Sequence, residues 1–261
     1  MAKRFDGKRV VITGAGVGIG LEIAKRFVAD GAVVVSADIA VTDALKQVTT
    51  SCGGGAFELD LGSRQGPVEL IERAIKIMGG VDILINNLGA SPVREGFLQT
   101  TDDHWERLFN INLFSMVRAT RAALPSLIEN QGVIVNVTSV LAREPIVIQP
   151  DYCATKAAIM NLSRNIATEF GPQGVRIVNV SPGPTLTPQW TEPGGQIEQY
   201  AERAGVSPDE ALKVTIPEDL GLALRRFVQP SEIADTVLFA CEATAITGTE
   251  LLVDAGMRRS V

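Results

Sequence analysis

Short apolar runs of strand length alternate along this chain with longer segments whose apolar residues recur every three or four positions. The strand-like runs lie at residues 9–14, 32–38, 56–61, 81–87, 132–139, 175–183 and 249–256. Because consecutive positions in these runs are apolar, both faces of each strand should be buried, which is typical of a parallel sheet covered by helices on both sides. The pattern therefore predicts a doubly wound α/β fold with seven strands.

The segments between the strands fit helices, and residues 18–31 show this most clearly. Ile19, Ile23 and Phe27 recur at spacings of four residues, so they share one face of a helix. Gly31 ends the pattern, as glycine commonly does at the end of a helix.

The domain organisation follows from length and from one change in composition. A chain of 261 residues is of ordinary length for one α/β domain, so we expect a single domain over residues 1–261. Between the sixth and seventh strands, Pro and Gly interrupt the alternation over residues 188–225. An insertion beyond the carboxyl end of a strand lies where ligands bind in such sheets, which predicts a mobile substrate lid.

The overall composition narrows the classes of function. Apolar residues make up 46% and charged residues 21% of the chain, which is typical of a globular protein. The net charge of −6 argues against nucleic-acid binding, because phosphate recognition needs clustered Lys and Arg. The sequence shows no signal-peptide core and no apolar run of membrane-spanning length, so we expect a cytoplasmic protein with no membrane partner.

The chain offers few candidate metal ligands. Cys52, Cys153 and Cys241 have no CxxC spacing and cannot all be paired within the chain, so we expect reduced thiols. His104 is the only histidine and lies outside an HExxH motif, so we expect no metal site. Cys153 lies beside a tyrosine, but the shortage of histidine favours packing over a nucleophilic role.

A glycine-rich stretch, TGAGVGIG, follows the first strand directly and opens the first helix. Its glycines, Gly14, Gly18 and Gly20, form GxxxGxG rather than GxGxxG, and the turn predicts a phosphate site at a helix N-terminus. A purely structural tight turn is the alternative. Asp38 ends the second strand, about where a carboxylate meets the ribose hydroxyls of a dinucleotide, and it would repel a 2′-phosphate. We therefore favour NAD over NADP, with a solvated turn residue as the other interpretation of Asp38.

The chain holds only two tyrosines, and one of them, Tyr152, stands four residues before Lys156. On a helix these side chains share a face, so the ammonium group can stabilise the phenolate and lower the Tyr152 pKa. A surface helix with an unrelated lysine would look the same. Ser139, at the end of the fifth strand, adds a hydroxyl at the edge where ligands bind.

Together these motifs resemble the short-chain dehydrogenase/reductase family over nearly the whole chain. TGAGVGIG matches its TGxxxGIG loop, NNLG its NNAG, YCATK its YxxxK, and SPGPTLT the PGxxxT segment. The resemblance implies a Rossmann fold and a catalytic set of Asn112, Ser139, Tyr152 and Lys156. Asn110 is a competitor for the place of Asn112.

The same resemblance implies a role for each catalytic residue. Tyr152 would exchange the hydroxyl proton, Ser139 would position the substrate oxygen, and Lys156 would lower the Tyr152 pKa and bind the nicotinamide ribose. Asn112 would support a water that links Lys156 to solvent. Hydride would pass directly between the substrate and the nicotinamide, so the reaction needs no metal.

The resemblance also implies the cofactor contacts. They are Gly14, Gly18, Ile19, Gly20, Asp38, Asp60, Leu61, Asn87, Gly89, Tyr152, Lys156, Pro182, Gly183, Thr185 and Thr187. Two positions depart from the family pattern: Leu88 stands where Ala is usual and could crowd the adenosine side, and Ala255 replaces the first Gly of VDGG near the C-terminus.

Apolar residues suggest the lining of the substrate pocket. They are Ile146, Val147, Ile148, Trp190, Ile197, Leu212 and Ile216, of which about half would serve equally well as core. Arg143 is either a contact for a substrate carboxylate or phosphate or an ordinary exposed arginine.

We predict an NAD-dependent oxidoreductase that interconverts a small-molecule secondary alcohol and a ketone, with Tyr152 as general acid and base. The alternatives are an NADP-dependent reductase of the 3-oxoacyl-carrier-protein type, against which Asp38 argues, and a nucleotide-sensing protein without turnover. The resemblance further implies a homotetramer or homodimer, packed through the helices around Asn112 and after Tyr152. Apolar positions there would equally well face the sheet; they are Phe114, Val117, Ala157 and Met160.

Overall fold

The seven predicted strands are all present in the computed structural model, which describes residues 3–257. They are β1 (Arg9–Thr13), β2 (Val33–Asp38), β3 (Gly55–Glu58), β4 (Ile83–Asn86), β5 (Val133–Val137), β6 (Arg176–Pro182) and β7 (Thr249–Val253). The strands are parallel and lie in the order β3-β2-β1-β4-β5-β6-β7. The order reverses between β1 and β4, and ligands of open α/β sheets bind beyond the carboxyl ends of the strands at such a point.

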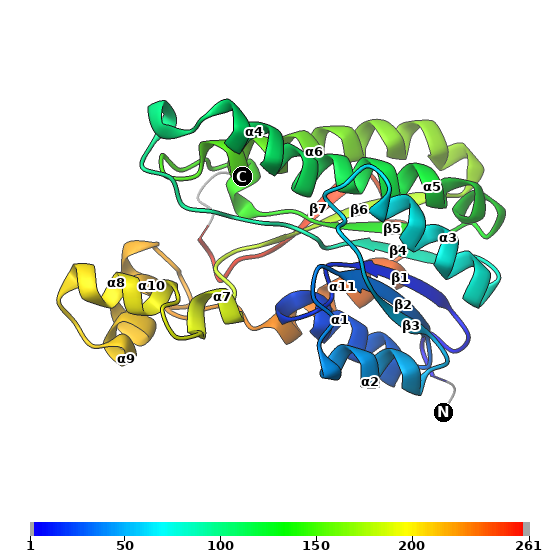
Figure 1. The fold of residues 1–261 in the computed structure, drawn as a ribbon, viewed down its shortest axis with the longest axis horizontal. Coiled ribbons are helices and arrows are strands. Elements are labelled where there is room, and N and C mark those ends of the chain that lie inside the picture. Colours follow the sequence, from blue (N-terminus) through cyan, green and yellow to red (C-terminus); the bar gives the residue numbers. More distant parts are fainter. Residues whose placement is uncertain (1–2, 258–261) are drawn as a thin grey trace.

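Helices cover both faces of this sheet (Figure 1). They are α1 (Gly18–Ala29), α2 (Asp43–Ser51), α3 (Gly66–Met78), α4 (Asp102–Phe109), α5 (Ser115–Glu129), α6 (Pro150–Phe170), α7 (Pro188–Thr191), α8 (Gln196–Ala204), α9 (Pro208–Glu210), α10 (Ile216–Asp219) and α11 (Pro230–Glu242). Short helical turns are η1 (Phe97–Gln99), η2 (Asn110–Phe114), η3 (Val140–Ala142), η4 (Gly171–Gln173) and η5 (Ala211–Thr215). Helices α1, α2 and α11 lie on one face, and α3, α5 and α6 lie on the other, with α4 beside α6. This is the doubly wound fold that the sequence predicts.

Alternate side chains of the strands pack into two separate apolar layers, one on each face of the sheet. Val10 and Ile12 of β1 pack on the side of α1, whereas Val11 between them packs on the side of α3 and α5. All three side chains are fully buried. Because consecutive strand side chains point to opposite faces, covering both faces requires the unbroken apolar runs seen in the sequence.

A buried ladder of asparagines ties α6 to the centre of the sheet. Asn86, Asn136 and Asn179 lie in register on β4, β5 and β6. Asn86 Nδ2 donates to Asn136 Oδ1 at 2.8 Å, and Ser163 of α6 hydrogen-bonds both Asn136 and Asn179. Buried polar groups are stable when they are paired in this way, so the ladder fixes the position of α6 against the sheet.

Residues 188–225 form a small helical unit outside the two main layers. Helices α7 to α10 project beyond the end of the sheet, drawn in yellow and gold in Figure 1. The unit packs around a separate apolar cluster, made of its own residues Ile197, Ala201, Ala211 and Ile216 together with Phe227, which lies just after it. The Trp190 ring packs edge-on against Phe227, with ring centroids 4.9 Å apart. Among residues 3–257, no helix combines the length and apolar character needed to cross a membrane.

Candidate active site

One large cavity opens at the carboxyl end of the sheet, with a volume of about 1300 Å³. Sites for drug-sized ligands typically measure about 300–1,000 Å³, so this cavity has room for a larger ligand or for two ligands side by side. The residues predicted to bind cofactor or to catalyse all line it, apart from Asn112, which lies behind its wall. The sequence-based assignment therefore converges on one place in the fold.

The loop after β1 presents backbone rather than side chains to the cavity. Helix α1 begins at Gly18, and its N-cap residue, Val17, makes no side-chain hydrogen bond to the helix. The first N–H groups of α1 therefore lack a side-chain cap and, with the helix dipole, favour an anion. Gly14 has a φ of +68°, and a Cβ on Gly20 would lie 2.2 Å from the Gly14 carbonyl oxygen. Glycine is required at both positions, and the cradle fits a phosphate-bearing cofactor.

Asp38 ends β2 and faces the same loop. Its carboxylate accepts hydrogen bonds from the backbone N–H groups of Gly16 at 2.8 Å and Ile39 at 2.7 Å. The Ile39 contact is one that a simple turn residue would make. The Gly16 contact holds the carboxylate against the glycine loop on the cavity wall, where a ribose hydroxyl would be recognised.

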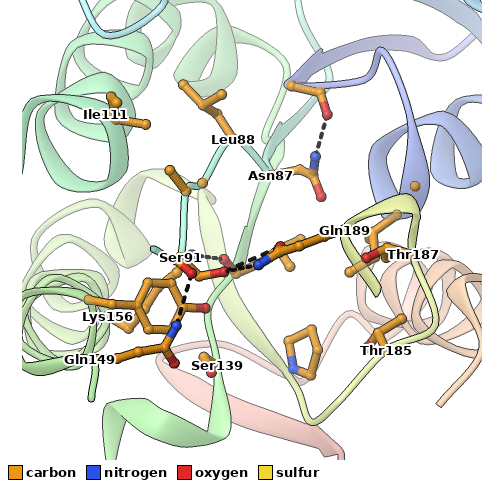
Figure 2. A pocket seen from close by; sticks show the side chains of 18 of the residues that line it. Asn87, Leu88, Ser91, Ile111, Ser139, Gln149, Lys156, Thr185, Thr187 and Gln189 are labelled. Carbon is orange, nitrogen blue, oxygen red and sulfur yellow. Dashed lines mark hydrogen bonds between the residues drawn. The ribbon is translucent and has the colours of Figure 1, made fainter. Parts of the chain in front are cut away.

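The remaining predicted cofactor residues line the cavity from three other segments. Asp60 and Leu61 follow β3, Asn87 and Gly89 follow β4, and Pro182, Gly183, Thr185 and Thr187 come from the end of β6 and the loop after it. Figure 2 labels Asn87, Thr185 and Thr187 among the residues that line the cavity. Asn87 Nδ2 donates to the carbonyl oxygens of Thr13 and Gly14, at 3.1 and 2.6 Å, and so links the end of β4 to the glycine loop.

Ser139, Tyr152 and Lys156 line the same cavity. Figure 2 labels Ser139 and Lys156 in it. Ser139 follows β5, and its Oγ accepts a hydrogen bond from the Leu141 N–H at 3.1 Å. Tyr152 and Lys156 lie one turn apart on α6, with Lys156 Nζ 5.7 Å from the centre of the Tyr152 ring. Lys156 Nζ also donates to the Val137 carbonyl oxygen at 2.9 Å. The spacing of the three residues in the sequence thus corresponds to proximity in the fold.

Burial shifts the pKa of both α6 groups toward their neutral forms. It raises the pKa of Tyr152 to about 12, and a hydrogen bond with Ser139 opposes only part of this rise. It lowers the pKa of Lys156 to about 8. In the protein without a ligand, the Tyr152 pKa therefore lies above its ordinary value, because loss of solvent outweighs the Ser139 hydrogen bond. The lowering effect of Lys156 stays a prediction.

Asn112 lies in the π-helical turn η2, between α4 and α5. It exchanges hydrogen bonds with the backbone of Ala90, at 2.9 and 3.0 Å, and donates to Thr155 Oγ1 at 3.0 Å. Short π-helical turns within α-helices are frequent at functional sites. Asn110, the competitor, lines the cavity itself and accepts a hydrogen bond from Arg118 at 3.0 Å. Of the two, Asn112 is the one tied to α6.

Three polar residues of the cavity wall were missed in the sequence. Gln149 stands directly before α6, Ser91 follows the NNLG motif, and Gln189 lies in α7. Ser91 Oγ and the Gln189 amide hydrogen-bond each other across the cavity, at 3.0 and 3.3 Å (Figure 2). The signal for Gln149 was its place three residues before Tyr152. Ser91 and Gln189 are 98 residues apart, so sequence spacing gives no signal for their contact.

The structure changes the interpretation of Arg143 and of some apolar residues predicted to line the substrate pocket. Arg143 Nε lies 2.8 Å from Glu250 Oε2, so an ion pair rather than a substrate anion accounts for this side chain. Among the apolar candidates, Ile146, Ile148, Trp190 and Ile216 line the cavity. Val147 is 80% exposed, whereas Ile197 and Leu212 belong to the core of residues 188–225.

The two departures from the family pattern have different surroundings. Leu88 lines the cavity, and Figure 2 shows it pointing toward Ile111 and away from Ser139. It also packs on the apolar layer beneath α3 and α5. Ala255 has a φ of +55°, in the left-handed region that favours glycine.

Comparisons with known proteins agree with this geometry. A family model described as enoyl-(acyl carrier protein) reductase matches residues 14–258. The chain is 33% identical to meso-2,3-butanediol dehydrogenase of Serratia marcescens, over 98% of this chain and 97% of that protein. L-sorbose reductase of Gluconobacter frateurii, solved with NADPH and L-sorbose, matches all of both chains with a TM-score of 0.91 and 28% identity. A 7α-hydroxysteroid dehydrogenase, solved with NADH and a 7-oxo bile acid, gives a TM-score of 0.82 and 32% identity over 98% of this chain and 96% of that one.

The matches cover the glycine loop, the residues around Tyr152 and the C-terminal strand alike. The named relatives are dehydrogenases and reductases of alcohols and ketones. The chain is therefore an enzyme of the short-chain dehydrogenase/reductase family that acts on CH–OH groups.

Proposed function

We propose that this protein is an NAD-dependent oxidoreductase that interconverts a secondary alcohol and a ketone, with Tyr152 as general acid and base. The observation that carries the proposal is that Tyr152 lies in one cavity with the uncapped N-terminus of α1 and the Asp38 carboxylate. A phosphate-binding helix end and a proton-transfer group in the same cavity fit hydride transfer from a dinucleotide. Dehydrogenases and reductases among the relatives support the reaction class.

The chemistry divides between the cofactor and this chain's own residues. A bound nicotinamide supplies or accepts the hydride at the substrate carbon and, when oxidised, adds positive charge to the site. Ser139 holds the substrate oxygen, while Tyr152 gives it a proton in reduction and takes its proton in oxidation. With a pKa of about 12, Tyr152 is protonated at neutral pH and suited to act as the acid.

In the oxidation direction Tyr152 must lose its proton. The positive charge of Lys156 on the same helix face favours the phenolate and opposes the effect of burial. Asn112 fixes Ala90 and Thr155 beside this pair, and we extend the proposal to a water, held by Asn112, that links Lys156 to solvent. In this scheme the residues that the family resemblance assigns to cofactor contacts bind the cofactor.

The choice of NAD over NADP rests on Asp38. Structures of relatives contain NADPH in one case and NADH in another, so membership in the family leaves the question open. In this chain the Asp38 carboxylate is held on the cavity wall by the Gly16 N–H. A negative charge there accepts hydrogen bonds from ribose hydroxyls and repels a 2′-phosphate.

Two further parts of the proposal concern larger units. Residues 188–225 act as the substrate lid of a single domain, because they line the cavity from outside the two main layers.

The chain forms a homotetramer or homodimer through the outer faces of α5 and α6. In support, Phe114 is 42% exposed and Ala157 is exposed, so neither faces the sheet.

The test is turnover measured as absorbance at 340 nm with NAD⁺ or NADP⁺ and a panel of aliphatic, cyclic, aromatic and steroid secondary alcohols. Tyr152→Phe should lower kcat roughly 100- to 10,000-fold, the usual contribution of a positioned acid or base. The affinity for NADH, followed by fluorescence, should change by less than about threefold, because the phenol ring remains.

The matched control is Tyr200→Phe, which removes the hydroxyl of the other cavity tyrosine, bonded to Asp219 within the lid. It should keep kcat within about tenfold of the original value, since that hydroxyl takes no part in proton transfer. Full activity of Tyr152→Phe would remove Tyr152 as the acid and base. NADH binding without turnover across the panel would favour the nucleotide-sensing alternative.

A further inference from the structure

Gln149 is a buried polar residue that the proposed reaction does not use. It stands directly before α6 and is only 8% exposed, yet its side chain lines the cavity with Ser139 and Tyr152. Its Nε2 donates to the carbonyl oxygen of Ser91 at 2.9 Å and, more weakly, to that of Pro92 at 3.4 Å. Figure 2 shows the bond to Ser91 and the position of Gln149 beside Ser139.

These two partners fix which way the Gln149 amide points. Both are carbonyl oxygens, which only accept hydrogen bonds, so the NH₂ group must face them and Oε1 must face away. Within residues 3–257, this Oε1 accepts no hydrogen bond from the protein. Gln149 Oε1 is not one of the buried unpartnered side-chain atoms of the described residues, which are Ser36 Oγ and Asn86 Oδ1. It is therefore open to the cavity, where a hydrogen-bond donor on a ligand can reach it.

The segments on either side of this amide are clamped together. The Arg94 guanidinium donates to Asp151 Oδ2 at 2.8 and 3.0 Å, and the Asp151 side chain is fully buried. The Arg94 N–H also donates to the Ile148 carbonyl oxygen at 2.8 Å. Because the loop after β4 and the start of α6 are held in this way, Gln149 is ordered before a ligand arrives, and binding to it loses little conformational entropy.

We propose that Gln149 Oε1 accepts a hydrogen bond from a hydroxyl group on the carbon next to the reacting carbon. The substrates are then vicinal diols in one direction and α-hydroxy ketones in the other. This inference rests on the proposed function, in which Ser139 and Tyr152 hold the reacting oxygen. Gln149 lines the same cavity, three residues before Tyr152, and Figure 2 draws it next to Ser139, so in this scheme its oxygen meets the neighbouring substituent.

The chemistry of an acceptor sets what it rejects as well as what it binds. A methyl group at that position would displace solvent from Oε1 without replacing its hydrogen bond, which is unfavourable for a polar atom. A carbonyl or carboxylate oxygen would place lone pairs against lone pairs. Residue 149 therefore selects a hydroxyl, while the nearby Ile146 and Ile148 provide apolar wall.

The experiment compares ketones that differ only at this substituent. Initial rates with NADH would give kcat/KM for 3-hydroxybutan-2-one against 3-methylbutan-2-one, and for 2-hydroxycyclohexanone against 2-methylcyclohexanone. The original enzyme should prefer the hydroxy ketone roughly 10- to 100-fold in at least one pair, as expected for one hydrogen bond to a substrate hydroxyl. Gln149→Met, which keeps the length of the side chain but has no amide, should reduce that preference to within about threefold.

α-Hydroxy ketones are intrinsically more reactive than their methyl analogues. Comparing the same pair of ketones in the original enzyme and in Gln149→Met corrects for this difference. The matched control is Ser91→Ala, which breaks the side-chain contact with Gln189 but keeps the Ser91 carbonyl that holds Gln149. It should retain at least half of the original preference. Loss of the preference in Ser91→Ala but not in Gln149→Met would overturn the inference in favour of the Ser91 hydroxyl.

The outcomes separate this inference from the proposed function. Equal turnover of hydroxy and methyl ketones by the original enzyme would overturn the role of Gln149 and leave ketone reduction intact. Turnover of the secondary-alcohol panel without turnover of any of the four ketones would overturn the inference alone. Bound NADH with no turnover of the four ketones or of that panel would contradict the proposed function and, with it, the inference. Thermal unfolding of Gln149→Met shows whether the variant is folded; if it is not, Gln149→Leu takes its place in the same comparison.

Discussion

The two ends of the cavity are built from different parts of the chain. At the cofactor end, the wall is largely backbone: Gly14, Gly18 and Gly20 line the cavity at the uncapped end of α1. At the substrate end, the wall is made of side chains, among them Tyr152 and Gln149, whose chemistry depends on burial and on distant partners.

This difference predicts that the two ends respond differently to substitution. A backbone site needs only a strand, a tight turn and a helix, which are local features. A side-chain site needs each group to be desolvated and oriented by its neighbours. Substitutions should therefore act on binding at one end and on proton chemistry and selectivity at the other.

The largest effect on stability is expected at the substrate end, from Lys156→Met. Burial lowers the Lys156 pKa from 10.5 in the unfolded chain to about 8 in the folded protein. Below pH 8 Lys156 is charged in both states, and because the charge is better solvated in the unfolded chain, it destabilises the folded protein. Removing it should stabilise the protein by about 2 kcal/mol at pH 7, after allowing for the lost bond to Val137. The gain should shrink as pH rises from about 8 toward 10.5, while activity is largely lost.

Denaturant unfolding at several pH values would check this sign. Lys46→Met, at an exposed position on α2, is the control and should change stability by less than about 0.5 kcal/mol. A Lys156→Met protein that is less stable than the original at pH 7 would contradict the view that burying the charged Lys156 ammonium destabilises the folded protein.

At the cofactor end, Asp38→Asn should shift the preference between the two dinucleotides. It removes the negative charge but keeps an oxygen that can accept from the Gly16 N–H. The ratio of NADH to NADPH affinity should fall roughly tenfold, about 1.4 kcal/mol, because a 2′-phosphate is no longer repelled. Fluorescence titration with both cofactors measures this ratio.

Asp43→Asn is the control for Asp38→Asn, because it removes an exposed carboxylate from the start of the neighbouring helix α2. It should leave the cofactor ratio nearly unchanged. If Asp38→Asn behaves like the control, selectivity must come from other cavity residues, such as Arg64 or Arg107.

The smallest effect is expected at Ala255, in the turn after β7. Its φ of +55° is unfavourable for a residue with a Cβ, and Ala255→Gly should relieve this by up to about 1 kcal/mol. The methyl group is buried, so its loss offsets part of the gain. A rise in Tm of a few degrees or less, with unchanged kcat/KM, is the expected result, and a clear fall in Tm would show that packing of this methyl dominates.

Much of the fold was readable because its signals are local. Each predicted strand lies on an observed one, since strands that are covered on both faces require unbroken apolar runs. The sequence left open which apolar residues of 188–225 line the pocket and which form a core. Ile197 of this unit packs in one cluster with Phe227, 30 residues further along the chain, and this cluster forms only after folding.

The candidate site shows the same division. Tyr152 and Lys156 were found together because four residues make one turn of a helix. The role of Arg143 could not be found in this way, because its partner Glu250 is 107 residues away. The direction of the Tyr152 pKa also depends on how deeply α6 is buried, which spacing does not reveal.

The sequence by itself determined the parallel sheet, the glycine cradle and the placing of Ser139, Tyr152 and Lys156 at one edge, because these follow from periodicity and from motifs within one turn or one strand. The tertiary structure decided the protonation of those groups, the pairing of Arg143 and the orientation of the Gln149 amide. The physical reason is that desolvation and hydrogen bonding depend on atoms brought close from distant parts of the chain, such as the Ser91 carbonyl, 58 residues before Gln149.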